Sequence, residues 1–348
     1  MNMAQKYILL ITTAFSVVTI VHIFCDKNHS GERKGRYYFP RWKKAVPNIT
    51  CHNSHKSLNN DALPSVEDKS FNPKSKSIFF HETSCRGGVD SRQACAVESA
   101  ARANPDWEVY LLFNAPVSDA MLKKSCLVKL LQYSNVRLAR IHAASFSKES
   151  AVQQIVRSKL PHSRYPVEHS ADIMRMLTLH RWGGLSLDLD MLVAKSFNNL
   201  PENWIVKETI KELSTGAMAF SREGIGHNFT GEVLKEMSKK YDNKSWSGNS
   251  PLIIQNVLRR YCNRTVDKYG FCNGVNIFKH DMFYPIHYAS TALYFEAKPL
   301  NLTYEPYTYH LWNALTEIYD VHPNSTYARL ARKYCSKVYR MYATSFGV

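Results

Sequence analysis

The sequence predicts an α/β fold in which a mostly parallel sheet is covered by helices on both faces. Two observations indicate it: strand-like and helix-like patterns alternate along the chain, and the composition turns abruptly apolar at Ser77. The chain has 348 residues, and the roughly 270 that begin at Ser77 are enough for one large α/β domain. We therefore expect a single folded domain over residues 77–348.

The segment before this domain is expected to have three parts. Residues 7–24 are an uncharged, mainly apolar run, which as a helix of about 27 Å can just cross a bilayer. We expect a transmembrane signal anchor preceded by a cytoplasmic tail over residues 1–6, because no clear small-x-small cleavage site follows the run. Residues 25–76 mix Lys, Asn, Ser, His and Pro and are interpreted as an extended stem.

The first elements of the domain follow one another at short spacing. Residues 77–81 form the first expected strand, and residues 92–103 the first helix. Strands are then expected at 109–113 and 136–141. A helix over 252–261 is indicated further along by Ser250-Pro251, since proline is favoured in the first turn.

The centre of the chain joins a helix, a glycine turn and a strand. The pattern from Glu168 to Trp182 has helical spacing, and Gly183 and Gly184 are expected to end it, since only glycine freely takes positive φ. Residues 185–190 then alternate between leucine and polar residues, which predicts a strand.

That strand is expected to carry two carboxylates on one side. Asp188 and Asp190 would lie about 7 Å apart along it. Paired oxygen ligands suit Mg²⁺ or Mn²⁺, whereas Zn²⁺ more often binds His or Cys. On the preceding helix, Asp172 and Arg175 are three residues apart and share a face, so they form either a structural salt bridge or part of a binding site.

Cysteines and glycosylation sequons predict a lumenal domain. Seven Asn-x-Ser/Thr sites lie beyond the apolar run, at Asn28, Asn48, Asn228, Asn243, Asn263, Asn301 and Asn324. The folded part holds an even set of cysteines, which suits an oxidising compartment: Cys85, Cys95, Cys126, Cys262, Cys272 and Cys335. The sequons and cysteines outweigh the positive-inside rule. That rule favours a cytoplasmic C-terminal domain, because Lys and Arg follow the apolar run at residues 7–24.

Two disulfides are expected, and the remaining pairings stay open. Cys85 with Cys95 and Cys262 with Cys272 would each close a short polar loop. The net charge of +16 is spread along the chain, which argues against a nucleic-acid partner. It favours anionic membrane surfaces and a diphosphate substrate.

The central pattern resembles a known signature. Ala-Asp-x-x-Arg, seven residues, then Gly-Gly-Leu-x-x-Asp-x-Asp, from Ala171 to Asp190, resembles retaining glycosyltransferases with an Asp-x-Asp motif. It is most similar to the α-1,4-galactosyltransferase and α-1,4-N-acetylglucosaminyltransferase family. Further matching stretches extend the resemblance to roughly residues 77–340: Phe79-Phe-His-Glu-Thr-Ser84, Cys95-Ala-Val-Glu-Ser-Ala-Ala101, Phe283-Tyr-Pro-Ile286 and His310-Leu-Trp-Asn313.

The resemblance implies a Rossmann-like GT-A fold and a type II protein of the Golgi membrane. It also implies a site for a metal ion and a UDP-sugar. Of the catalytic pair Asp188 and Asp190, Asp190 would ligate Mn²⁺ or Mg²⁺ directly, and Asp188 would contact the metal or the ribose. His310 would complete the metal site. Asp172 and Arg175 would face the donor sugar and its phosphates. The resemblance also places Gly183, Gly184, Trp312 and Asn313 at the UDP-sugar.

The implied reaction is retaining transfer of a hexose or N-acetylhexosamine from a UDP-sugar, in α-1,4 linkage, to a lactosylceramide-like glycosphingolipid. The alternative within the family is an N-acetylglucosaminyl- or N-acetylgalactosaminyltransferase acting on other glycolipid or glycoprotein glycans. Two remote alternatives are a noncatalytic glycan-binding protein and an Asp-x-Asp phosphohydrolase. The phosphohydrolase motif normally continues x-Thr/Val, whereas Met191-Leu192 follows here.

Overall fold

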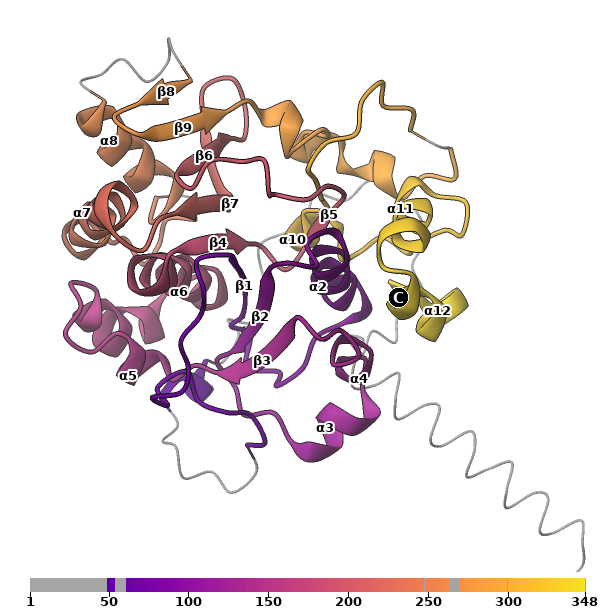
Figure 1. Ribbon diagram of the computed structural model, residues 1–348, viewed down its shortest axis with the longest axis horizontal. Helices are drawn as coiled ribbons and strands as arrows, with labels where there is room; N and C mark the ends of the chain where they lie inside the picture. The colour runs from indigo at the N-terminus through magenta and orange to yellow at the C-terminus, as the bar shows by residue number, and fades with distance from the viewer. Residues whose placement is uncertain (1–48, 54–60, 247, 263–269, 299, 348) are drawn as a thin grey trace, which may run out of the picture.

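The structure, a computed structural model, describes residues 49–53, 61–246, 248–262, 270–298 and 300–347 (Figure 1). The predicted tail and anchor, and the predicted stem up to residue 48, lie outside these ranges. Within them, none of the helices has both the length and the apolar character needed to cross a bilayer.

A mixed eight-stranded sheet forms the centre of the molecule. Its strand order is β3-β2-β1-β4-β7-β6-β9-β8. The strands are β1 (Ser77–Glu82), β2 (Glu108–Phe113), β3 (Val136–Arg140), β4 (Gly184–Leu187), β6 (Trp204–Lys207), β7 (Leu213–Phe220), β8 (Phe271–Cys272) and β9 (Val275–Phe278). A separate two-stranded sheet pairs β5 (Met191–Val193) with β10 (Thr308–His310).

The sheet is less parallel than the sequence predicts. Strands β3, β2, β1 and β4 are mutually parallel, as expected from the alternation of strands and helices. β7 runs antiparallel to both of its neighbours because β6 and β7 form a hairpin, closed where Glu208 N donates to Glu212 O at 2.8 Å. The prediction of an α/β fold is confirmed, with a mixed sheet in place of a mostly parallel one.

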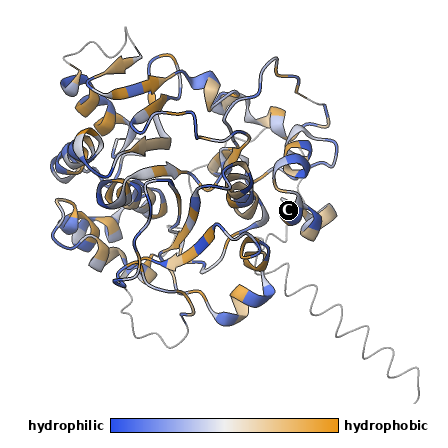
Figure 2. Cartoon of the chain, in the orientation of Figure 1, coloured by the Kyte–Doolittle hydropathy of each residue, from blue (hydrophilic) through white to orange (hydrophobic). Residues whose placement is uncertain are grey.

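Helices cover both faces of this sheet, as predicted (Figure 1). One hydrophobic core joins the sheet to α2 (Ser91–Ala103), α4 (Leu127–Leu130), α11 (Thr326–Tyr334) and α12 (Ser336–Tyr342). The other joins it to α5 (Ala143–Phe146), α6 (Pro166–Trp182), α7 (Gly224–Lys240) and α8 (Pro251–Tyr261). In Figure 2 the centre of the sheet is coloured largely as hydrophobic, whereas the covering helices alternate along their length.

Short helices complete the element list. They are η1 (Thr50–Asn53), α3 (Asp119–Lys124), η2 (Ile155–Lys159), η3 (Leu160–His162), η4 (His280–Met282), η5 (Tyr288–Tyr294), α10 (Asn313–Thr316) and η6 (Ala343–Ser345). The four strands and the helices predicted at 92–103, 168–182 and 252–261 are present within two residues of their expected starts.

The packed region begins before Ser77. Val66 is buried, and the backbone of Arg140 on β3 donates to Pro64 O at 2.8 Å. The Arg140 guanidinium also pairs with Asp61, with 3.1 Å between Nε and Oδ2. Residue 77 therefore marks the start of the sheet, and residues 61–66 pack along the edge formed by β3.

One of the two predicted disulfides is confirmed and one is wrong. Cys262 pairs with Cys272, as expected. Cys85 pairs with Cys51 and not with Cys95, which instead bonds Cys335 across 240 residues. Short sequence separation did not predict the partner of Cys95. Cys95 lies inside α2, which packs against α12, and Cys335 directly precedes α12.

The Asp-x-Asp segment is a turn and not a strand. β4 ends at Leu187, and Met191 N donates to Asp188 O at 3.0 Å before β5 begins. The chain turns here because it passes from the large sheet to the small one. The prediction that Asp188 and Asp190 share one face of a strand is therefore wrong, although the turn brings them close together.

Candidate functional site

Three segments far apart in sequence meet at the carboxyl end of β4. The turn after β4 contributes Asp188 and Asp190, and β10 contributes His310. One ligand atom from each lies within 4.8 Å of the others. The β5–β10 pairing, in which His310 lies opposite Met191, brings the histidine to the turn.

Asp190 is held by two hydrogen bonds from the C-terminal segment. His310 Nε2 lies 3.0 Å from Asp190 Oδ1, and the Asn313 amide donates to Asp190 Oδ2 at 2.7 Å. Burial opposes charge on both partners, but the mutual attraction is larger. It holds the pKa of Asp190 below its usual range and that of His310 above it.

The Trp312 ring covers His310, with their ring centroids 3.9 Å apart. Trp312 has φ of 54°, a left-handed conformation that is uncommon for a residue with a large side chain. This conformation starts α10 and presents the Asn313 amide to Asp190. The side-chain polar atoms His310 Nδ1, Trp312 Nε1 and Asn313 Oδ1 are buried and have no hydrogen-bond partner within the described ranges.

Arg175 on α6 pairs with Asp188 more closely than with its helical neighbour Asp172. Its Nη2 lies 2.6 Å from Asp188 Oδ1, whereas its Nε lies 3.8 Å from Asp172 Oδ1. Arg175 Nη1 also donates to the carbonyl of Thr215 on β7. A structural salt bridge between Arg175 and Asp172 within α6 therefore accounts only for the longer of the two carboxylate contacts of Arg175.

Asp172 is buried beside this pair. Burial raises the pKa of Asp172 to about 7, against the lowering effect of Arg175. Near neutral pH its carboxyl group therefore exchanges between the protonated and ionised forms, so it can donate or accept a hydrogen bond.

The location matches a general rule for α/β sheets. The chain runs from β1 to β2 and β3 on one side and then returns to β4 on the other, so the strand order reverses between β1 and β4. Ligands of open α/β sheets bind outside the carboxyl ends of the strands at such a reversal. The ends of β1 and β2 add buried polar atoms, Glu82 Oε2 and the Asn114 amide, that have no partner among the residues described.

Gly183 and Gly184 do not join this site. They lie at the amino end of β4, the opposite end from Asp188. Both have positive φ, and an added Cβ would meet backbone atoms: Arg222 N at 2.5 Å for Gly183 and Ser77 O at 2.7 Å for Gly184. The pair ends α6 and lets β4 pack closely beside β1.

Sequence reasoning missed two residues beside Asp188 and one acidic neighbour. Tyr284 and Gly216 lie next to Asp188 Oδ2. Glu208, after β6, interacts electrostatically with His310 and Asp188, and burial raises its pKa to about 7. Tyr284 belongs to a stretch that matches the family, but nothing in that stretch marks it as facing the carboxylates.

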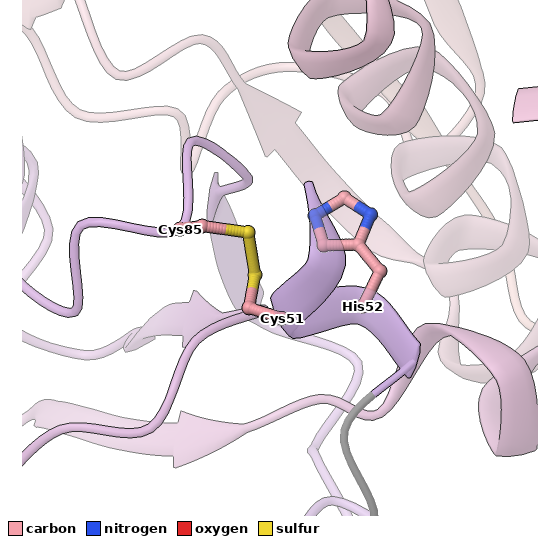
Figure 3. Close-up of side chains that lie close together, drawn as sticks. All are labelled: Cys51, His52 and Cys85. Carbon is pink, nitrogen blue, oxygen red and sulfur yellow. A yellow bond between two sulfur atoms is a disulfide. The ribbon is translucent and has the colours of Figure 1, made fainter. Parts of the chain in front are cut away.

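A second cluster has a different role. Cys51, His52 and Cys85 also offer close ligand atoms, but the two sulfurs are bonded to each other, with the His52 ring beside them (Figure 3). His52 Nε2 donates to Thr83 O at 3.0 Å. The cluster ties η1 to the loop after β1.

Comparison with known proteins gives two adjoining family matches. Residues 90–209 match the family described as "Glycosyltransferase sugar-binding region containing DXD motif", which includes the Asp188–Asp190 turn. Residues 222–342 match the "Alpha 1,4-glycosyltransferase conserved region", which includes His310. The resemblance inferred from the sequence motifs is thus confirmed.

Relatives that align with 76% of this chain agree with these matches. Lactosylceramide 4-alpha-galactosyltransferase of Mus musculus is 28% identical over 274 residues, covering 76% of this chain and 75% of that protein. Alpha-1,4-N-acetylglucosaminyltransferase of Homo sapiens is 23% identical over 282 residues, covering 76% and 80%. Among solved structures, galactosyltransferase LgtC in complex with donor and acceptor sugar analogs aligns with a TM-score of 0.41 and 16% identity, covering 74% of this chain and 96% of that one.

Proposed function

We propose that this chain, which belongs to the alpha-1,4-glycosyltransferases that carry a DXD motif, is a metal-dependent enzyme acting on a UDP-sugar. It would transfer a hexose or N-acetylhexosamine, with retention, in α-1,4 linkage to a lactosylceramide-like glycosphingolipid. The observation that carries the proposal is the convergence of Asp188, Asp190 and His310 at the strand-order reversal. A nucleotide diphosphate is the ligand class that this edge of an α/β sheet typically binds.

The donor set fits Mn²⁺ or Mg²⁺. Two carboxylates supply hard oxygen ligands, and one imidazole favours Mn²⁺ of the two. Asp188, Asp190 and His310 would hold the ion, which when bound would stabilise the negative charge on the departing diphosphate. Asn313 fixes the orientation of Asp190 through its amide.

The remaining polar residues would bind the donor. The Arg175 guanidinium is fixed by Asp188 and Thr215, so it would present a rigid fork to phosphate or sugar oxygens. Asp172, with its pKa near 7, would bond a sugar hydroxyl as donor or acceptor. Trp312 covers the His310 ring on one side of the site.

The glycosphingolipid acceptor is proposed from the relatives. The related galactosyltransferases are named for their action on lactosylceramide. A basic domain, with net charge +16 for the whole chain, would be drawn to the anionic surface of the bilayer that holds such an acceptor. Anchoring in the Golgi membrane through residues 7–24, with the domain lumenal, completes the proposal.

One alternative within the family has specific support. The similarity to the N-acetylglucosaminyltransferase covers as much of the chain as the similarity to the galactosyltransferases. The phosphohydrolase alternative is disfavoured, because Asp188 is ion-paired with Arg175 and follows β4, not the first strand of the sheet.

A donor and acceptor screen tests the proposal. The full chain, purified in detergent, is incubated with Mn²⁺ and UDP-galactose, UDP-N-acetylgalactosamine or UDP-N-acetylglucosamine, and UDP release is measured. Lactosylceramide-type and mannosyl-glucosylceramide-type acceptors are compared, and the linkage of the product is determined by NMR. Acceptor-dependent release that EDTA abolishes is expected. Binding of glycan without UDP release from any donor would favour the noncatalytic alternative.

A further inference from the structure

The Tyr284 hydroxyl carries a buried proton beside the candidate site. Tyr284 is 3% exposed, and the Ser214 side chain is hydrogen-bonded to its oxygen in the sense that lowers the pKa of the phenol, that is, as a donor. The Tyr284 proton itself has no acceptor within the part of the chain that the structure describes. The ring is fixed by an edge-on contact with His310, at 5.4 Å between centroids, and by Trp312 at 6.0 Å. Buried hydroxyl donors almost always have an acceptor, so a fixed one without an acceptor beside a candidate site indicates a ligand.

Gly216 shows where this hydroxyl points. A Cβ added at Gly216 would lie 2.9 Å from Asp188 Oδ2 and 3.0 Å from the Tyr284 hydroxyl. The two oxygens therefore flank the same small space above β7. Gly216 has no positive φ that would demand glycine, so the missing side chain serves to leave this space open.

Asp188 has one oxygen available for that space. Its Oδ1 already accepts from Arg175 at 2.6 Å, whereas Oδ2 faces Gly216. A phenol is a donor, and each carboxylate oxygen has two lone pairs, so Oδ2 can accept from a ligand hydroxyl while Asp188 also faces the metal site. A ligand hydroxyl, which both accepts and donates, complements this pair.

We propose that Tyr284 and Asp188 Oδ2 together bind one hydroxyl group of the nucleotide-sugar, in the space that Gly216 leaves open. The Tyr284 hydroxyl donates to the ligand oxygen, and the ligand hydroxyl donates to Asp188. The inference rests on the proposed function and adds Tyr284 as a donor-binding residue and Gly216 as a steric requirement.

The hydroxyl belongs either to the ribose or to the transferred sugar, and binding measurements separate the two. The Kd values of UDP, UDP-galactose and UDP-N-acetylglucosamine are measured by calorimetry with Mn²⁺ on the full chain in detergent. Tyr284→Phe is expected to weaken binding by about three- to tenfold, the loss of one hydrogen bond. If the ribose is bound, all three ligands weaken together. If the transferred sugar is bound, UDP keeps its Kd and only a UDP-sugar weakens.

Two further variants control for structural effects. Tyr294→Phe removes a buried hydroxyl that has no hydrogen-bond partner among the described residues and whose ring packs against Tyr309 of β10. This variant is expected to leave every Kd unchanged. Gly216→Ala fills the space and is expected to weaken nucleotide-sugar binding at least as much as Tyr284→Phe. Thermal unfolding checks that each variant is folded.

The outcomes separate the inference from the proposed function. If the wild type binds neither UDP nor a UDP-sugar, the proposed function fails, and the inference with it. If the wild type binds and folded Tyr284→Phe binds every ligand with wild-type affinity, the inference alone is overturned. Equal weakening by Tyr284→Phe and Tyr294→Phe would also overturn it, because the effect would then be one of packing.

Discussion

Asp190 is the residue on which most of the candidate site depends. It accepts hydrogen bonds from His310 and from the Asn313 amide, and its own carbonyl accepts from Leu311 N at 3.0 Å. The carboxylate therefore has one fixed orientation before any ligand binds. Such preorganisation lets an electrostatic group act without reorienting during the reaction.

Asp190→Asn should retain the fold and lose turnover. The amide has the same shape but removes one charge from the metal set. Loss of one preorganised electrostatic group typically costs about 3 to 4 kcal/mol, roughly 10²- to 10³-fold in kcat. UDP release with Mn²⁺ measures this, with exposed Asp106→Asn as the matched control. Wild-type turnover in Asp190→Asn would remove Asp190 from the metal set.

Arg175→Lys tests whether the guanidinium binds the donor. Lysine keeps the charge beside Asp188 but cannot reproduce a fork that bonds Thr215 and a ligand together. We expect a donor KM raised about tenfold and a lower kcat, from steady-state kinetics with the preferred UDP-sugar. Kinetic constants close to those of the wild type would leave Arg175 with a structural role only.

The residue types of the site were predictable, whereas their geometry was not. Asp188 and Asp190 stand out because of their spacing and the glycines before them, but the turn at Asp188–Met191 depends on a passage between two sheets that no local pattern encodes. His310 was identified through the family resemblance alone, since one histidine among 14 carries no signal. The sequence carried no signal for Tyr284 either, because its proposed role depends on the space left at Gly216.

Among the elements, η1 is attached to the site side of the sheet by a histidine and a disulfide. His52 is buried, donates from Nε2 to Thr83 O and lies 3.3 Å from the Ser170 hydroxyl on α6. Burial lowers the pKa of His52 to about 4. The ring is therefore neutral in the folded protein at neutral pH.

This predicts an acid-sensitive attachment of η1. Between pH 6.5 and about 4 the unfolded chain binds a proton at His52 that the folded chain does not, so the free energy of unfolding falls with decreasing pH. The free energy of unfolding lost through His52 is about 3 kcal/mol at most. In His52→Gln, the decrease in unfolding free energy between pH 7 and pH 4.5 should be smaller than in wild type, measured by urea denaturation. Exposed His162→Gln should keep the wild-type decrease, and equal decreases in all three proteins would contradict the prediction.

Helices and strands with strong local sequence patterns were predictable. The tertiary contacts that these elements make were not. The buried strands β1 and β2 have apolar runs at their centres, and α8 begins at its proline, so each could be placed from the sequence. The direction of β7 depends on hairpin closure, and the packing of residues 61–66 depends on Arg140; both are tertiary contacts. The same holds for Cys95, whose partner lies at the other end of the domain.

For the whole molecule, the Cys95–Cys335 bond joins the first helix of the domain to its C-terminal helices. Closing so long a loop in the unfolded chain stabilises the folded state by about 5 kcal/mol in the chain-entropy estimate, with about 2 to 5 usual for native disulfides. The double variant Cys95→Ser with Cys335→Ser should lower the midpoint of denaturation accordingly. The matched double variant of Cys262 and Cys272, which removes a bond across only 10 residues, should lose less. Equal losses would contradict the estimate.

The predicted lumenal orientation has a direct test. Asn301 and Asn324 are exposed, in loops before β10 and α11. Glycosidase digestion of the cellular protein should increase its gel mobility, and Asn301→Gln with Asn324→Gln should reduce that shift. Full resistance to digestion, with protease access to the domain in intact microsomes, would contradict the lumenal orientation.

The pairing of Asp190 with His310 also sets an order of events during synthesis. Asp190 leaves the ribosome 120 residues before the histidine that pairs with it. β5 has no described partner other than β10, so the nascent chain exposes an unpaired strand beside Asp190 until almost all of it has been translated. The candidate site therefore forms last, and any binding capacity of this site first appears when the polypeptide is nearly complete.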